Sequence, residues 1–182
     1  MNYLFRIQEK KAPHRAGFTI IELLVVIGII GMLSSTLLFA MESSRQKSRD
    51  VVRLSEMRSV RQALELYFTQ NKQYPGTDGD GCGGWDVGNA AHPLFSGQGM
   101  DQFFNNKIAP VERSQTEDCN GYRYYRYAAG DYGCPVARGA YYVVGVGNME
   151  TTGNPHPASP GWSCPGRNWQ DEFDWVSGGY EN

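Results

Sequence analysis

The chain has 182 residues, enough for one modest domain and an appendage. Its 17 Lys and Arg residues nearly balance 19 Asp and Glu residues, and the resulting net charge of −2 argues against nucleic acid as a default partner. Because only one long apolar run is present, near the N-terminus, the composition excludes both an ordinary cytosolic globular domain and a protein with several membrane spans.

The apolar run occupies residues 18–41 and contains a single charged side chain, Glu22. As a helix it extends about 36 Å, which exceeds the roughly 30 Å of a bilayer core. A secretory signal peptide has an apolar core of only about 7–15 residues, followed by a cleavage site. The run is too long for that class, so the sequence predicts a membrane-spanning helix. A basic leader, residues 1–17, precedes it.

The junction between leader and apolar run reads Gly17-Phe18-Thr19-Ile20-Ile21-Glu22. It resembles the cleavage and methylation signal of type IV pilins and type II secretion pseudopilins, and the resemblance extends over residues 12–70. It implies that a prepilin peptidase cleaves between Gly17 and Phe18 and that Phe18 becomes an N-methylated N-terminus. It also implies that Glu22 meets the terminal amine of a neighbouring subunit during assembly, since such a pair neutralises two charges in a medium of low dielectric constant.

The resemblance further implies the partners and the location of the protein. The expected partners are the peptidase, other pilin or pseudopilin subunits and membrane lipid, with no nucleic acid. The expected location is the inner membrane, crossed once, with an extracytoplasmic C-terminal head that joins a pilus or pseudopilus. Many pilus-forming members carry a proline in the middle of the apolar segment, but no proline occurs here before Pro75. The sequence therefore leaves pilus and pseudopilus open.

Residues 42–70 continue the helix with an amphipathic pattern. Apolar residues recur at steps of three or four, which indicates one buried face: Leu54, Met57, Val60, Leu64, Tyr67 and Phe68. Basic residues occupy much of the remainder, and we interpret them as a solvated face, with electrostatic docking to neighbouring subunits as the alternative: Arg45, Lys47, Arg49, Arg53, Arg58 and Arg61.

Residues 71–182 form the predicted globular head. Residues 71–99 are rich in glycine and form an irregular connection, and residues 100–108 form a short helix. Residues 121–128 and 139–147 are rich in aromatic and β-branched side chains and predict two antiparallel strands. The second strand is apolar on both faces, so we expect the helix to cover one face and a loop the other.

Residues 150–182 carry four prolines and three tryptophans, and we expect an ordered loop wrapped over the sheet. Asp171, Glu172 and Asp174 lie close together in this region. Major pseudopilins commonly bind calcium in a C-terminal loop, but these residues do not match that motif. The prediction is therefore a solvated acidic turn, with no cofactor and no metal and with calcium as the alternative.

The four cysteines, Cys82, Cys119, Cys134 and Cys164, lack the short spacing of a zinc ribbon. They predict two disulfides in an oxidising compartment. Cys119 and Cys134 flank a strand of about 25 Å, far beyond the roughly 4.4–6.8 Å of a bridge. We therefore expect Cys82–Cys119 and Cys134–Cys164. The pairing Cys82–Cys164 with Cys119–Cys134 stays open, since the loop can fold back.

The sequence thus predicts an α+β, pilin-like fold, in which one long N-terminal helix packs on a small antiparallel sheet with a long irregular C-terminal region. The expected role is a structural subunit that is processed and polymerises. The alternative is a minor pilin whose aromatic head binds a surface, a secreted substrate or DNA. Motifs for a nucleophilic serine, a zinc protease or a phosphate-binding loop are absent, so we expect no enzymatic activity.

Overall fold

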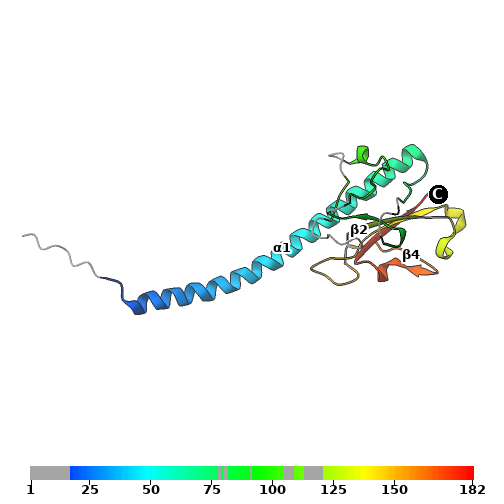
Figure 1. The fold of residues 1–182 in the computed structure, drawn as a ribbon. Coiled ribbons are helices and arrows are strands. Elements are labelled where there is room, and N and C mark those ends of the chain that lie inside the picture. The colour runs from blue at the N-terminus through cyan, green and yellow to red at the C-terminus, as the bar shows by residue number, and fades with distance from the viewer. Residues whose placement is uncertain (1–16, 78, 80–81, 91, 105–108, 113–120) are drawn as a thin grey trace, which may run out of the picture. The chain divides into compact units, whose positions relative to one another are not determined.

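The computed structural model describes residues 17–77, 79, 82–90, 92–104, 109–112 and 121–182. One long helix, α1 (Ile20–Asn71), is followed by a small sheet and several 3-10 turns (Figure 1). The chain divides into two compact units, one up to Glu42 and one from Ser43 onward, so α1 contributes to both. The sequence prediction of a helix ending at residue 70 is confirmed to within one residue.

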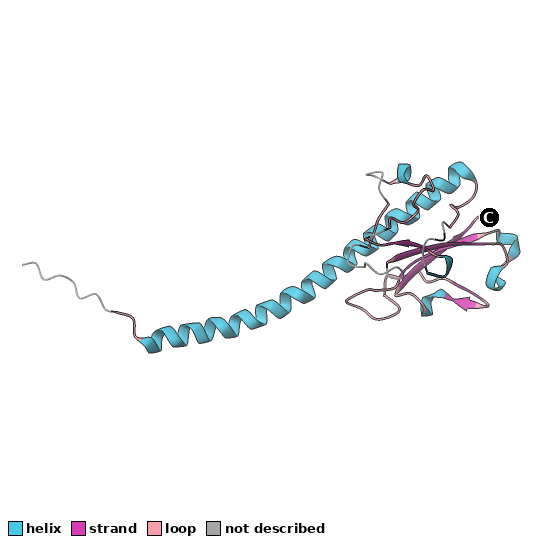
Figure 2. Ribbon diagram, viewed as in Figure 1, coloured by secondary structure: helices cyan, strands magenta, loops and turns pink. Residues whose placement is uncertain are grey.

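Among the described residues of the second unit, six strands follow α1 (Figure 2). They are β1 (Asp86–Gly88), β2 (Tyr122–Tyr127), β3 (Tyr141–Val146), β4 (Ser163–Cys164), β5 (Arg167–Asn168) and β6 (Trp175–Tyr180). The main sheet has the order β1-β2-β3-β6 with all neighbours antiparallel, and β4 and β5 form a separate hairpin. The 3-10 turns are η1 (Cys82–Gly84), η2 (Asp101–Phe103), η3 (Asp131–Gly133), η4 (Val136–Arg138) and η5 (Trp169–Asp171).

Strands β2 and β3 confirm the two strands predicted from the sequence. The predicted short helix at residues 100–108 was only partly right: the structure has the 3-10 turn η2, after which Phe104 is extended. Residues 105–108 lie outside the described part of the chain. Strands β1 and β6 were missed, because β1 has three residues and β6 contains Ser177, Gly178 and Gly179, which have low strand propensity.

Strand β3 is buried along its whole length, because both faces of the sheet are covered. On one face, residues of α1 such as Met57 and Leu64 share a core with Tyr124, Tyr142 and other sheet residues. On the other face, Trp169, Phe173 and Trp162 of the C-terminal segment share a second core with the sheet. The expected arrangement, with a helix on one side and a C-terminal loop on the other, is confirmed.

Glycines in β3 and β6 make room for aromatic rings. A Cβ atom at Gly145 would lie 2.5 Å from the ring of Phe173, and one at Gly178 would lie 2.4 Å from Trp162. Real Cβ atoms do not approach other heavy atoms this closely. The C-terminal layer can therefore pack on the sheet only if the residues at positions 145 and 178 have no side chain. The residues that weaken the strand signal in β6 are therefore the ones that the packing requires.

The outer edge of β6 is closed by one side chain, Ser159. Its hydroxyl oxygen accepts a hydrogen bond from the backbone N–H of Val176 at 3.0 Å and lies 3.3 Å from the carbonyl oxygen of the same residue. These are the groups that a further strand would bond. Ser159 thus satisfies the backbone hydrogen-bonding groups at the middle of an edge strand without extending the sheet.

Candidate functional site

The predicted cleavage point lies directly before α1. Gly17, Phe18 and Thr19 have no regular secondary structure, and the helix begins at Ile20. Phe18 is 86% exposed, and nothing lies within 4 Å of the position of a Cβ at Gly17. The bond between Gly17 and Phe18 is therefore outside the helical hydrogen-bond ladder and open on its surface.

Thr19 and Glu22 form a reciprocal cap at the start of α1. The Glu22 carboxylate accepts hydrogen bonds from the Thr19 N–H at 2.9 Å and from its hydroxyl at 2.8 Å, while the Thr19 hydroxyl accepts from the Glu22 N–H at 3.2 Å. Such a capping box satisfies backbone donors that the first helical turn leaves free. It explains why the helix starts here, and it holds Glu22 at the N-terminal end of the apolar run. The sequence analysis missed the role of Thr19, although a threonine followed three residues later by a glutamate is the signal for such a box.

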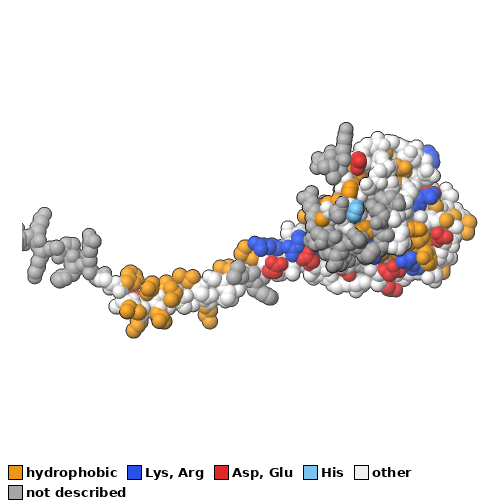
Figure 3. All heavy atoms as spheres, in the orientation of Figure 1, with side chains coloured by type: hydrophobic (Ala, Val, Ile, Leu, Met, Phe, Trp, Pro, Cys, Tyr) orange, Lys and Arg blue, Asp and Glu red, His pale blue; other side chains and the backbone are white. Residues whose placement is uncertain are grey.

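The first half of α1 presents apolar side chains to its surroundings. Ile20, Leu23, Leu33 and Leu37 are each at least 60% exposed, and the apolar window of the helix has no buried residues. Figure 3 shows these side chains along the N-terminal half of the helix. The helix is long and apolar enough to cross a membrane. An exposed apolar helix of this length needs lipid or other helices around it.

One base of the second half of α1, Arg53, is not solvated as the sequence analysis assumed. It is 2% exposed, and its guanidinium bonds Asp50 at 2.7 Å, Glu150 at 2.7 Å and also Glu112. Burial disfavours its charge, but the hydrogen bonds that Arg53 donates to Glu112 and Glu150 outweigh burial and raise the pKa of Arg53. The prediction failed because two of the three acidic partners, Glu112 and Glu150, are brought to Arg53 only by tertiary folding.

Asp50 anchors the loop after β3 to α1. It accepts hydrogen bonds from the backbone N–H groups of Glu150 and Thr151 at 3.0 and 2.8 Å, and from the Thr151 hydroxyl at 2.6 Å. Burial alone would raise the pKa of Asp50, but the bonds from Thr151, Glu150 and Arg53 together lower it. Arg49 adds a bridge to Glu150 at 2.5 Å. The helix and the loop are thus held by a network of charges.

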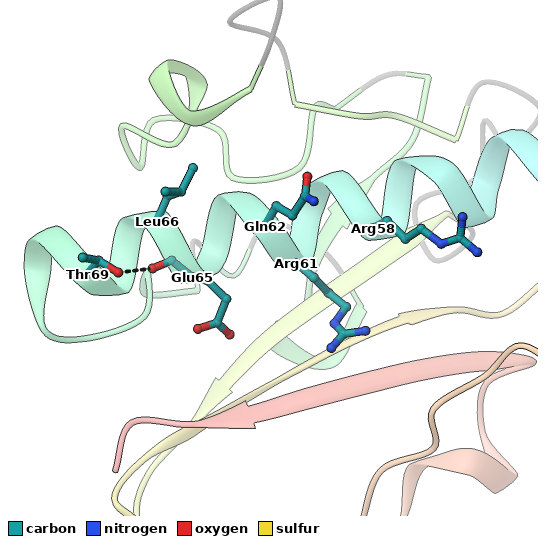
Figure 4. Close-up of a pocket in the computed structure, with 6 residues that line it drawn as sticks. All are labelled: Arg58, Arg61, Gln62, Glu65, Leu66 and Thr69. Atoms are coloured by element: carbon teal, nitrogen blue, oxygen red, sulfur yellow. Dashed lines mark hydrogen bonds between the residues drawn. The ribbon is translucent and has the colours of Figure 1, made fainter.

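Two other bases line a groove of about 620 Å³ along an exposed part of α1 (Figure 4). Arg58 and Arg61 are both exposed. Four further residues of the same helix complete the lining: Gln62, Glu65, Leu66 and Thr69. Leu66 is 53% exposed, so the groove combines positive charge with an apolar side chain.

The structure contains the predicted disulfide between Cys134 and Cys164, with Cα atoms 5.0 Å apart. It joins the turns between β2 and β3 to the β4–β5 hairpin, so it fastens the C-terminal layer to the sheet. The other predicted pair, Cys82–Cys119, lies outside the described side chains. Within the described part of the chain, no group of three or more His, Cys, Asp or Glu side chains is placed to hold a metal ion.

Comparison with known proteins gives matches to a methylation motif and to proteins of type II secretion systems. A family model described as the prokaryotic N-terminal methylation motif matches residues 13–38. Type II secretion system core protein G of Pectobacterium carotovorum subsp. carotovorum is 34% identical over 62 residues, which cover 34% of this chain and 40% of that protein. The protein of the same name from Vibrio cholerae serotype O1 is 30% identical over 69 residues, covering 38% of this chain and 47% of that protein.

A third relative is core protein G of Escherichia coli (strain K12), which is 34% identical over 62 residues, covering 34% of this chain and 43% of that protein. The chain thus spans less than half the length of the curated relatives that it matches. No solved structure matches it significantly. The family model covers the predicted cleavage point, the cap and most of the exposed apolar run.

Proposed function

We propose that the chain is a structural subunit of a type II secretion pseudopilus, because its N-terminal methylation motif and its similarity to type II secretion core protein G both support membership of the type IV pilin and pseudopilin family. One observation carries the proposal: an open Gly17–Phe18 bond lies directly before a capped helix whose apolar half is exposed. A protease needs an accessible, non-helical bond, and a polymerising helix needs an uncovered apolar surface. Both features lie within residues 17–41.

In this function the subunit starts as a membrane protein with its head outside the cytoplasm. A prepilin peptidase on the cytoplasmic side cleaves after Gly17 and methylates the amine of Phe18. The cap from Thr19 to Glu22 does not involve residues before the cut, so α1 keeps its start after cleavage. The disulfide Cys134–Cys164 supports the outside location of the head, because such bridges persist in oxidising compartments.

Assembly then brings the new amine of one subunit to Glu22 of its neighbour. Thr19 holds the carboxylate at the end of the helix, where it is the only acidic side chain within the apolar run. Glu22 follows the new terminus, Phe18, by four residues, which is about one turn of helix. A lone carboxylate in a bilayer is unfavourable by a few kcal/mol. Pairing with a cation removes this penalty, which favours the assembled state over the free subunit.

Two observations favour a pseudopilus over a pilus. The helix α1 runs without proline, unlike many pilus-forming members, and the relatives reported above are all named as type II secretion core protein. A minor pilin that binds ligands through its aromatic head is not favoured. Most aromatic rings of the head pack against one another inside the two cores.

The groove lined by Arg58 and Arg61 is a candidate site for electrostatic contact between the heads of neighbouring subunits. Residues 71–182 contain 7 basic and 13 acidic side chains, so a neighbouring head carries net negative charge. We propose that this groove receives an acidic surface of the next copy. Reversing both charges, Arg58→Glu with Arg61→Glu, should lower filament yield while leaving cleavage unchanged, and unchanged filament yield would oppose the assignment.

The decisive test of the proposed function is coexpression of the full chain with a prepilin peptidase, followed by intact-mass measurement of the membrane fraction. The expected product lacks residues 1–17 and carries one added methyl group. A parallel culture without the peptidase should give the uncut chain. A product that keeps its leader in the presence of an active peptidase, shown active on a known substrate, would overturn the proposal.

A further inference from the structure

Within the part of the chain that the structure describes, Arg45 and Lys47, the two bases nearest the apolar run, neither pair with an acidic side chain nor line the groove, unlike the other bases of α1 in the second unit. Arg49 and Arg53 are tied to acidic partners, and Arg58 and Arg61 line the groove. Arg45 and Lys47 are exposed, and the described residues form no ion pair with either of them. Figure 3 shows Lys and Arg side chains gathered on this stretch of helix. These two bases are therefore available to a partner from outside.

Their placement around the helix indicates the kind of partner. Successive residues of an α-helix are rotated by about 100°, so Arg45 and Lys47, two residues apart, point about 160° away from each other. Arg58 and Arg61, three residues apart, point to the same side, within about 60°. Bases on one side suit a single docked protein. Bases on opposite sides suit a medium that surrounds the helix.

Their placement along the helix indicates which medium. From Ile20 to Met41 the helix is apolar over about 33 Å, close to the roughly 30 Å of a bilayer core. Arg45 and Lys47 follow Met41 by about 6 and 9 Å along the helix axis. The headgroup layer of a bilayer occupies about 5–7 Å on each side of that core. Both bases thus fall at or just above the phosphate groups, within reach of their long side chains.

We propose that Arg45 and Lys47 bind the phosphate groups of anionic phospholipids in the leaflet on the head side. The inference rests on the proposed membrane anchoring of α1. It also accounts for basic residues on the outer flank, where the usual charge distribution of membrane proteins does not place them. Cleavage after Gly17 removes the four bases of the leader, so the pair Arg45 and Lys47 becomes the main basic contact of the processed subunit with lipid phosphate groups.

The test measures lipid selectivity on the head side alone. The full chain is reconstituted into phosphatidylcholine vesicles with the head outside, as verified by protease accessibility. Spin-labelled phosphatidylglycerol or phosphatidylcholine is added to the outer leaflet only, and electron paramagnetic resonance gives the motionally restricted fraction of each. Because the leader lies at the other leaflet, its bases do not contribute, and no assembly machinery is needed.

The wild-type chain should restrict phosphatidylglycerol more than phosphatidylcholine, and high salt should reduce the difference. Arg45→Gln with Lys47→Gln should abolish the difference, whereas the matched control Arg58→Gln with Arg61→Gln should retain it. Equal restriction of both lipids by the wild-type chain, or the same loss in both double variants, would overturn the proposal. Lipid selectivity without any cleavage by prepilin peptidase would instead refute the proposed function and leave this inference standing.

Discussion

Asp50 and Arg53 face each other one helical turn apart, 2.7 Å between Oδ1 and Nη1, at a point of α1 where both side chains are almost fully buried. The same aspartate holds the backbone of Glu150 and Thr151, and the same arginine holds Glu112 and Glu150. The pair therefore connects one helix to two separate segments of the head. Helix and head depend on each other through this contact.

Replacing Arg53 by methionine should strongly destabilise the head. The methionine fills the space but leaves Asp50 and Glu112 buried without their cation, and breaking a buried ion pair from one side costs about 3–5 kcal/mol. Urea unfolding followed by tryptophan fluorescence measures the change. The matched control Arg58→Met, on the exposed face, should stay within about 0.5 kcal/mol of wild type. Equal stability of the two variants would contradict the role assigned to Arg53.

Acid should weaken the same contact. The pKa of Asp50 is lowered below 3.8, and the bonds from Arg49 and Arg53 lower the pKa of Glu150 below 4.5 despite its partial burial. A carboxyl group with a depressed pKa stabilises the fold at pH values above its unfolded pKa, and this contribution is lost as the pH falls through the folded value. We expect the free energy of unfolding to fall from about pH 5 downward. Asp50→Asn should be less stable at pH 7 and should show a shallower fall below pH 5.

Adding a methyl group at Gly145 should disturb the C-terminal layer. A Cβ there meets the ring of Phe173, and forcing extra volume into a packed core costs about 1–3 kcal/mol. Thermal unfolding of Gly145→Ala should show the loss. Gly147→Ala is the control, because nothing lies within 4 Å of a Cβ at that position. A control variant as unstable as Gly145→Ala would show that backbone freedom, and not the contact with Phe173, decides the result.

Removing the bridge between Cys134 and Cys164 should also destabilise the head. The cysteines are 30 residues apart, and closing a loop of that size contributes about 3–4 kcal/mol by restricting the unfolded chain. Cys134→Ser with Cys164→Ser is compared with wild type by urea unfolding. Non-reducing peptide mapping of the wild type should then find Cys82 linked to Cys119. A peptide that joins Cys119 to Cys134 would refute the pairing.

Glu22→Ala should leave membrane insertion intact and lower filament assembly. Removing a carboxylate makes the helix more soluble in lipid, so the amount of subunit in the membrane should not fall. Assembly should drop because the neighbouring amine loses its partner. Thr19→Val tests the cap separately, since it retains the charge of Glu22 and removes a hydroxyl, with an expected loss of about 1 kcal/mol of helix stability at the N-terminus. Normal filament numbers for Glu22→Ala would exclude a pairing role.

Local patterns predicted the features that depend on neighbours in sequence. The apolar run, the long helix and the strands β2 and β3 all follow from periodicity and propensity over short windows. The bridge Cys134–Cys164 followed from the reach of an extended strand. The junction before Phe18 was identified by its motif, and only the part played by Thr19 was overlooked.

Features that depend on distant partners were not predictable in this way. Strand β6 contains glycines that oppose a strand locally, and only the rings of Trp162 and Tyr142 explain why they are there. Arg53 is one of six bases along the second half of α1, yet it is buried, and its partners Glu112 and Glu150 come to it from far along the chain. Such positions depend on tertiary contacts that no short window contains.

Ser159 has a consequence for copies of the head that lie close together. Heads with open strand edges would join edge to edge into stacked sheets, which are hard to dissolve again. The hydroxyl of Ser159 bonds the backbone of Val176, so edge-to-edge pairing is blocked at the centre of β6. Copies of the head can therefore lie side by side without pairing through the centre of β6, and contacts between them are left to side chains.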